Sequence, residues 1–130
     1  LRSELQTIMQ NFFGVFRRGD YMKHGIKQLS ELKPRIDDVA LEDKSSAFNT
    51  ARIEALELRN LFAVAEATAI VAEARTESRG AHAREDFQDR DDENWLCHSM
   101  FFPEAKRVGK RDVNFTPKTH EPFEPVERTY

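Results

Sequence analysis

Apolar residues near the start of the chain recur every three or four positions, which is the spacing of an amphipathic helix. The first such run extends from Leu1 to Arg18, and its apolar positions are Leu1, Leu5, Ile8, Phe12 and Val15 or Phe16. Gly14 lies within the run, where a single glycine weakens a helix only slightly. Gly19 and Asp20 predict a C-terminal stop followed by an N-cap, because glycine adopts positive φ readily and an aspartate carboxylate accepts from free backbone N–H groups. A second helix should begin near Tyr21.

The second helix has one apolar stripe and contains a proline. The stripe consists of Met22, Ile26, Leu29, Leu32 or Lys33, Ile36 and Val39 or Ala40. Pro34 lies inside this stretch, where proline removes a backbone donor and crowds the preceding turn. We therefore expect a kink or an early break near Leu32. Residues 41–48 are rich in charged residues and serine and predict a connection.

The third helix is the clearest prediction and is apolar on two faces. It extends from Asn49 to about Ser78, with Asn49 or Thr50 as the N-cap, and is filled with residues of high helix propensity. One stripe consists of Ile53, Leu56, Leu61, Val64, Thr68 and Val71, and the other of Ala55, Leu58, Phe62, Ala65, Ala69 and Ala72. Two apolar faces require two packing partners. Residues 1–80 are therefore predicted to form an antiparallel, spectrin-repeat-like three-helix bundle, in which Leu58→Ala or Leu61→Ala costs on the order of 2 to 5 kcal/mol.

After Gly80 the helical period disappears, so the fold class is mainly α with a small β element. Residues 95–102 and 112–116 alternate in polarity, and Val108-Gly109-Lys110 between them predicts the turn of a short antiparallel hairpin. From Pro117 onward, Pro122 and Pro125 predict an extended tail. Residues 81–130 thus form a docking loop, a β-hairpin and a tail of the same domain. A two-stranded ribbon is marginal alone, so we expect its aromatic residues to be covered partly by polypeptide outside this chain.

Composition narrows the class of protein. At 130 residues the chain is one domain, and its net charge of −3, with the acidic excess in the second half, argues against a nucleic-acid-binding surface. The single cysteine, Cys97, excludes an internal disulfide framework and fits a reducing compartment. No signal peptide or run of membrane-spanning length appears. The first residue is Leu1 and already lies in a helical pattern, so we expect the start to be a cut.

The sequence contains no recognisable motif for cofactor binding, metal binding or nucleophilic catalysis. The five glycines are scattered and form no dinucleotide-binding turn, and one cysteine cannot ligate an iron–sulfur cluster. His24, His82, His98 and His120 do not have the spacing of a zinc site with Cys97. Serines near histidines lack a nucleophile elbow. We therefore assign no catalytic, cofactor-binding or metal-binding residue to this chain.

A charged segment follows the third helix, and the order of its residues is informative. It reads Glu77-Ser78-Arg79-Gly80-Ala81-His82-Ala83-Arg84-Glu85-Asp86-Phe87, followed by Arg90-Asp91-Asp92. This order resembles a signature of the flavoprotein subunits of succinate dehydrogenase and fumarate reductase, shared in part with L-aspartate oxidase. The resemblance extends through residues 45–50, 93–99 and the final Arg128-Thr129-Tyr130, and is greatest to the bacterial succinate dehydrogenase form.

The resemblance implies that this chain is the C-terminal helical domain of such a subunit and has an architectural role. The intact subunit would oxidise succinate to fumarate with FAD and pass electrons to an iron–sulfur subunit, indirectly linked to membrane anchors on the cytoplasmic side of a bacterial inner membrane. The same resemblance leaves open fumarate reductase, L-aspartate oxidase or a free-standing helical interaction module. The residues expected to dock on the FAD domain are those that match the signature, Arg79, Gly80, His82, Arg84, Asp86, Arg90 and Asp92.

Overall fold

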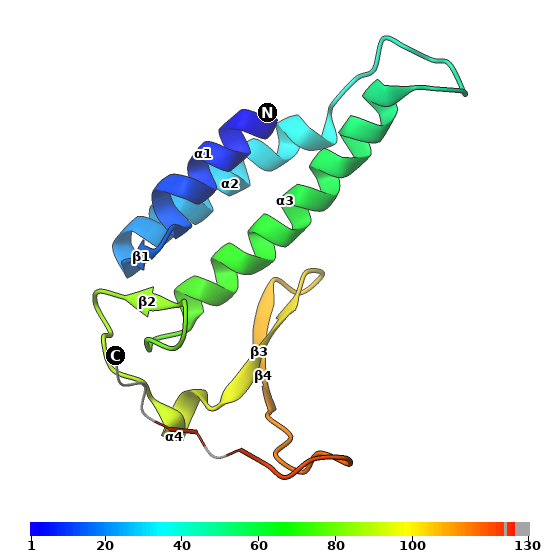
Figure 1. The fold of residues 1–130 in the computed structure, drawn as a ribbon. Helices are drawn as coiled ribbons and strands as arrows, with labels where there is room; N and C mark the ends of the chain where they lie inside the picture. Colours follow the sequence, from blue (N-terminus) through cyan, green and yellow to red (C-terminus); the bar gives the residue numbers. More distant parts are fainter. Residues whose placement is uncertain (124, 127–130) are drawn as a thin grey trace.

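The computed structural model describes residues 1–123 and 125–126, and this part of the chain is mainly helical. Its helices are α1 (Arg2–Phe13), α2 (Gly19–Asp37), α3 (Thr50–Ala74) and the one-turn α4 (Asp92–Trp95). Two short strands, β1 (Phe16–Arg17) and β2 (Ala83–Arg84), pair in parallel, and β3 (Cys97–Phe102) and β4 (Arg107–Asp112) form an antiparallel hairpin. In Figure 1, α1 and α2 lie along one side of the longer α3, and the hairpin lies on its other side.

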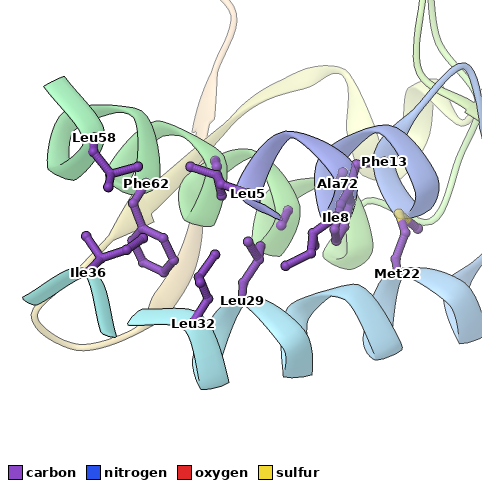
Figure 2. Packing of buried hydrophobic residues seen from close by; sticks show 12 residues of the cluster. Leu5, Ile8, Phe13, Met22, Leu29, Leu32, Ile36, Leu58, Phe62 and Ala72 are labelled. Atoms are coloured by element: carbon purple, nitrogen blue, oxygen red, sulfur yellow. The ribbon is translucent and has the colours of Figure 1, made fainter. Parts of the chain in front are cut away.

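One hydrophobic cluster holds α1, α2 and α3 together. All three helices contribute side chains to it, as Figure 2 shows. Met22 and Ala69 are completely buried. Its members are Leu5, Ile8, Phe13, Met22, Leu29, Leu32, Ile36, Leu58, Phe62, Ala65, Ala69 and Ala72. Nearly all of them belong to the predicted apolar stripes, because one face of each helix must leave water for the domain to fold.

The first helix ends earlier than its periodicity predicts. It stops at Phe13, and Gly14 continues in an extended conformation, so the predicted helix to Arg18 is wrong. The guanidinium of Arg17 folds back and donates to the carbonyl oxygens of Gly14 and Phe13, at 3.1 and 3.3 Å. These bonds satisfy carbonyls that a helix end leaves free. The chain that follows pairs with β2 instead of continuing the helix.

The second helix contradicts the early break expected near Leu32. It runs from Gly19 to Asp37 without interruption, so Gly19 opens the helix rather than ending the previous one. Pro34 lies in the last turn, where its missing N–H removes a single helical hydrogen bond. Leu32 and Ile36, on either side of it, are buried in the cluster and hold the final turn against α3.

The third helix begins as predicted but buries one apolar stripe only. The side chain of Asn49 accepts from the N–H of Arg52 at 2.8 Å, which confirms the N-cap, whereas the helix ends at Ala74 and not at Ser78. The stripe that includes Leu58 and Phe62 is buried against α1 and α2. The other stripe is largely exposed, with Leu61 45% and Val64 67% accessible, so the inference that both faces are covered and that Leu61 is a core residue is wrong.

The hairpin forms as expected but with a different turn. Residues 103–106 make the turn, and Gly109 lies in β4 opposite Met100. Lys106 adopts a positive φ of 45° there, which the sequence pattern did not indicate. Gly109 serves a packing role instead, since a Cβ at this position would lie 3.1 Å from the ring of Phe102.

Trp95 belongs to α4 rather than to a strand, and the chain itself covers it. The side chain is 8% exposed, its indole N–H donates to Thr76 Oγ1 at 3.2 Å, and Lys110 Nζ lies 3.7 Å from the ring centroid. Its expected need for cover from outside the chain is therefore wrong. Phe123 in the tail is 87% exposed. The predicted match at Arg128-Thr129-Tyr130 lies outside the described residues.

Membrane spanning is a separate question. In the part of the chain that the structure describes, no helix is both long and apolar enough to cross a membrane.

Candidate functional site: a charged junction at the helix ends

The charged segment folds against the ends of the three long helices. The C-terminus of α1, the N-terminus of α2 and the C-terminus of α3 lie at the same end of the domain, next to the β1–β2 pair (Figure 1). Helix ends carry free backbone donors and acceptors that need partners. We call the side chains that supply these partners the helix-end junction, which consists of Arg17, Arg75, Glu77, Arg79, His82, Arg84 and Asp86.

Arg84 donates hydrogen bonds to the free backbone carbonyl oxygens at the C-terminus of α3. Its side chain is almost fully buried, and its Nη1 donates to the carbonyl oxygens of Ala72, Glu73 and Arg75 at 3.2, 2.9 and 3.0 Å. A cation is favoured there because the helix dipole is negative at its C-terminus. Arg84 thus satisfies several carbonyls of the last turn of α3 with one nitrogen.

Asp86 joins Arg84 to the start of α2. Its carboxylate accepts from Arg84 Nε and Nη2 at 2.7 and 2.8 Å, and from the backbone N–H of Gly19 at 3.0 Å. These hydrogen bonds, that of Arg84 first, hold the pKa of the Asp86 carboxyl well below its usual range. Gly19 is required at this position, because a Cβ would approach Asp86 Oδ2 to 2.9 Å.

Glu77 is a buried carboxylate of the junction that binds Arg75 and Arg79. Its carboxylate accepts from Arg75 Nε, Arg79 Nε and the backbone N–H of Asp91 at 2.8, 2.9 and 2.8 Å, and its side chain is inaccessible to water. Burial alone would raise the pKa of Glu77, but the hydrogen bonds from Arg79, the Asp91 N–H and Arg75 outweigh it, so the pKa is lowered. The ionised form is therefore the stable one.

Arg75 connects the junction to the hairpin. Its guanidinium donates to the carbonyl oxygen of Cys97 at 3.2 Å, to Ser99 Oγ at 3.0 Å and to the carbonyl oxygen of Trp95. The same group lies over the Trp95 ring, 5.2 Å from its centroid. Through this one side chain, α4 and β3 are held at the end of α3.

His82 links the junction to α1. Its Nδ1 lies 2.8 Å from Arg17 Nη1, and its Nε2 lies 3.1 Å from the carbonyl oxygen of Arg75. Burial first, and then the positive charges of Arg17, Arg84 and Arg75, lower the pKa of the imidazole, against the opposing effect of its hydrogen bond to the Arg75 backbone. His82 is thus held neutral between two fixed partners.

The outer part of the segment is more exposed. Arg79 donates to Asp92 Oδ1 at 2.6 Å, and Arg90 pairs with Asp92 at 2.9 Å. Gly80 has a positive φ of 59° and closes a tight turn in which Arg79 and His82 exchange backbone hydrogen bonds. Arg90 also donates to the carbonyl oxygen of Val126 at 2.8 Å in the tail.

The structure thus brings the predicted docking residues together, and it pairs each of their charged side chains within this chain. Sequence reasoning missed Arg17 and Arg75, which lie in ordinary helical or connecting patterns and carry no motif signal. Glu77 was part of the recognised segment but was not singled out. No buried polar side-chain atom of the described residues lacks a hydrogen-bond partner, which makes the junction a closed network.

A groove lies beside the junction, between α3 and the hairpin. Its volume is about 1000 Å³, its lining is mostly apolar but includes Glu66, Thr68 and His98, and its polar end reaches the junction. The sides include Ala67, Val71, Phe101 and Pro103, and the polar end includes Arg17 and His82. Beyond the groove, the apolar residues Ile53, Leu56, Leu61 and Val64 of α3 remain exposed, and we call them the outer face of α3. Among the described residues no group of three or more potential metal ligands is found.

Comparison with known proteins agrees with the recognised segment. The family model described as fumarate reductase flavoprotein C-term matches residues 2–130. A succinate dehydrogenase flavoprotein subunit of Coxiella burnetii is 48% identical over 98% of this chain and 22% of its own length. One from Rickettsia conorii is 41% identical over 100% of this chain and 23% of its own length.

Solved structures with a similar fold belong to related proteins. A mutant of the quinol fumarate reductase of E. coli superposes on 95% of this chain and 22% of its own with a TM-score of 0.81 and 37% identity. The chain spans about a fifth of the length of the relatives that it matches. The chain belongs to the fumarate reductase flavoprotein C-terminal family, which includes the succinate dehydrogenase flavoprotein subunits.

Proposed function

We propose that this chain is the C-terminal helical domain of a succinate dehydrogenase flavoprotein subunit and acts as a structural domain. In the intact subunit, succinate is oxidised to fumarate with FAD and the electrons pass to an iron–sulfur subunit. Residues 1–80 act as an antiparallel three-helix bundle, and residues 81–130 as its docking loop, hairpin and tail. The observation that carries the proposal is a closed helix-end junction formed by the family signature, beside an apolar surface that the described chain leaves uncovered.

The residues of this chain do not fit a flavin site of the kind that binds a pyrophosphate at a helix N-terminus. The long helix that follows a strand is α2, and its first N–H, on Gly19, is already bound by the carboxylate of Asp86. An anion at this position would meet that carboxylate. The FAD is therefore proposed to be held by the part of the subunit outside this chain.

The surface proposed to dock on the FAD domain is the outer face of α3 together with the groove. The outer face is apolar and exposed, and Ala67 and Val71 on the side of the groove lie next to it on α3. Contiguous exposed apolar patches mark interaction sites. The signature residues Arg79, Gly80, His82, Arg84, Asp86, Arg90 and Asp92 are proposed to shape the edge of this surface, with Arg79 and Arg90 as its most accessible cations.

The partners and location follow from the same proposal. The domain contacts the FAD domain of its own subunit and the iron–sulfur subunit, and reaches the membrane anchors indirectly. It would thus lie at the cytoplasmic side of a bacterial inner membrane. The direction of catalysis is proposed as succinate oxidation because the most similar sequences named above are succinate dehydrogenase subunits. The structural similarity to quinol fumarate reductase favours fumarate reduction as the second candidate.

The docking surface can be tested in the intact subunit with Val64→Arg. A charge on the outer face should lower flavin content and succinate oxidation, while the melting temperature of the 130-residue chain changes little because Val64 is 67% exposed. Gln6→Arg, at an exposed position of α1, is the matched control and should leave flavin content unchanged. Normal flavin content and turnover in the Val64→Arg subunit would show that this face does not dock. Rates of succinate oxidation and fumarate reduction measured on the unmodified complex distinguish the two directions.

A further inference from the structure

His82 is fixed in one neutral form by its two ring contacts. A guanidinium has donors only, so the Nδ1 atom that lies 2.8 Å from Arg17 Nη1 must accept a hydrogen bond. The ring proton is therefore on Nε2, which donates to the carbonyl oxygen of Arg75 at 3.1 Å. Both nitrogens are used, and protonation of the ring must break one of these bonds.

The charges that face His82 come from every element packed around it. Arg17 approaches from β1, Arg75 from the end of α3 and Arg84 from β2. The charges of Arg75 and Arg84 are partly offset, because each guanidinium is paired with a carboxylate, Glu77 and Asp86 respectively. Arg17, by contrast, has no ion pair among the described residues, so its charge is the one that the ring meets directly. A proton on Nδ1 would place two donors and two positive charges against each other at the Arg17 contact. Like charges at this separation repel strongly in a partly buried site.

Arg17 is also the residue through which β1 and the end of α1 are held. Its guanidinium satisfies the carbonyl oxygens of Phe13 and Gly14, and its own carbonyl oxygen accepts from the N–H of Glu85 at 2.8 Å. In the β1–β2 pair, Arg17 lies opposite Arg84. Displacing the Arg17 side chain therefore removes the C-terminal cap of α1 and weakens a strand pair that has only two residues in each strand.

We propose that the His82–Arg17 contact is an acid-sensitive latch, which is closed at neutral pH and opens on protonation of His82 to release residues 14–18 from β2. The released segment links α1 to α2, so opening loosens the junction without dissolving the hydrophobic cluster, which other residues form.

The sign of the pH dependence follows from linkage. Burial and the neighbouring arginines lower the pKa of His82 in the folded chain, so the open state binds the proton more tightly than the closed state. The closed latch is therefore fully stable above the ordinary histidine value of about 6.5, and it loses stability as the pH falls below that value. This is the range in which histidine switches operate.

The test is hydrogen exchange, followed by mass spectrometry, between about pH 7.5 and 5.5, with rates corrected for intrinsic chemistry. In the unmodified protein, peptides covering residues 14–18 and 82–87 should lose protection several-fold on acidification, while peptides from the middle of α3 should not. His82→Gln retains an acceptor and a donor but cannot titrate, so its protection should not depend on pH. His98→Gln, at an exposed position of β3, should behave like the unmodified protein.

A second measurement needs no variant. Ring carbon shifts of His82 in the unmodified protein should report the Nε2–H tautomer at neutral pH and a pKa below the ordinary histidine value of about 6.5. Unchanged protection of residues 14–18 on acidification, the same pH dependence in His82→Gln, or a His82 pKa at or above the ordinary value of about 6.5 would each overturn the latch.

Discussion

Replacing Arg84 by alanine tests whether the junction holds the helices together. The change removes the hydrogen bonds to three carbonyl oxygens at the end of α3 and the bidentate ion pair with Asp86. Hydrogen bonds to charged groups contribute about 1.5 to 3 kcal/mol each but are not additive, and breaking a buried ion pair costs about 3 to 5 kcal/mol. The Asp86 side chain is 35% exposed, so water can compensate part of its loss. We expect the free energy of unfolding to fall by about 3 kcal/mol, a large part of the stability of a small domain.

Urea unfolding of the 130-residue chain measures this loss, and Trp95, the single tryptophan, reports it by fluorescence because it is buried next to Arg75. Arg90→Ala is the matched control. Its guanidinium is 35% exposed and pairs with an exposed carboxylate, so the expected loss is under about 1 kcal/mol. Arg84→Lys keeps the charge without the planar fork and should recover only part of the stability. A loss of under about 1 kcal/mol for Arg84→Ala, or one equal to that of Arg90→Ala, would refute the structural role of the junction.

Three further predictions concern the helices and their acid stability. Leu58→Ala should lower the free energy of unfolding by about 2 to 5 kcal/mol, whereas Leu61→Ala should lower it by under about 1 kcal/mol, because only Leu58 is buried; equal losses in urea unfolding would contradict this. Gly25→Ala should lower the free energy of unfolding by about 1 to 3 kcal/mol, and with it the melting temperature, since the new Cβ would lie 2.6 Å from two phenylalanine side chains of α1. An unchanged Tm would show that α1 and α2 can move apart to accept the methyl group without cost. The pKa values of Glu77 and Asp86 are lowered in the folded chain, so their stabilising contribution is present above the unfolded values of about 4 and lost as the pH falls below them; acid unfolding that is unchanged by Glu77→Gln would contradict this.

The hydrophobic pattern predicted the helices because burial follows the helical period. Leu29, Leu32 and Ile36 are buried where the stripe of α2 placed them, and Asn49 caps α3 as its side-chain chemistry indicates. The pattern could not tell which of two apolar faces has a partner in this chain. Both stripes of α3 are apolar in sequence, yet α1 and α2 pack on the face that contains Leu58.

The helix ends were predicted less well because long-range contacts decide them. Nothing near Gly14 in the sequence indicates that Arg17 will cap the helix and pair with a strand more than sixty residues later in the chain. The turn at Lys106 was missed for a related reason, since Gly109 offered a stronger local turn signal but is used for packing against Phe102. The residues of the charged segment were found by their order alone, whereas their partners Arg17 and Arg75 needed coordinates.

The position of the junction has a consequence for how this domain could be shortened. The carbonyls that end α3 and the first N–H of α2 depend on Arg84 and Asp86, which lie beyond residue 80. A truncation at residue 80 would retain every helical residue of the hydrophobic cluster, yet it would leave these backbone groups facing solvent and remove His82, one of the acceptors of Arg17. Expression boundaries chosen from helix content alone would therefore remove the side chains that bind the helix ends. The shortest stable form of the domain should continue at least through Trp95.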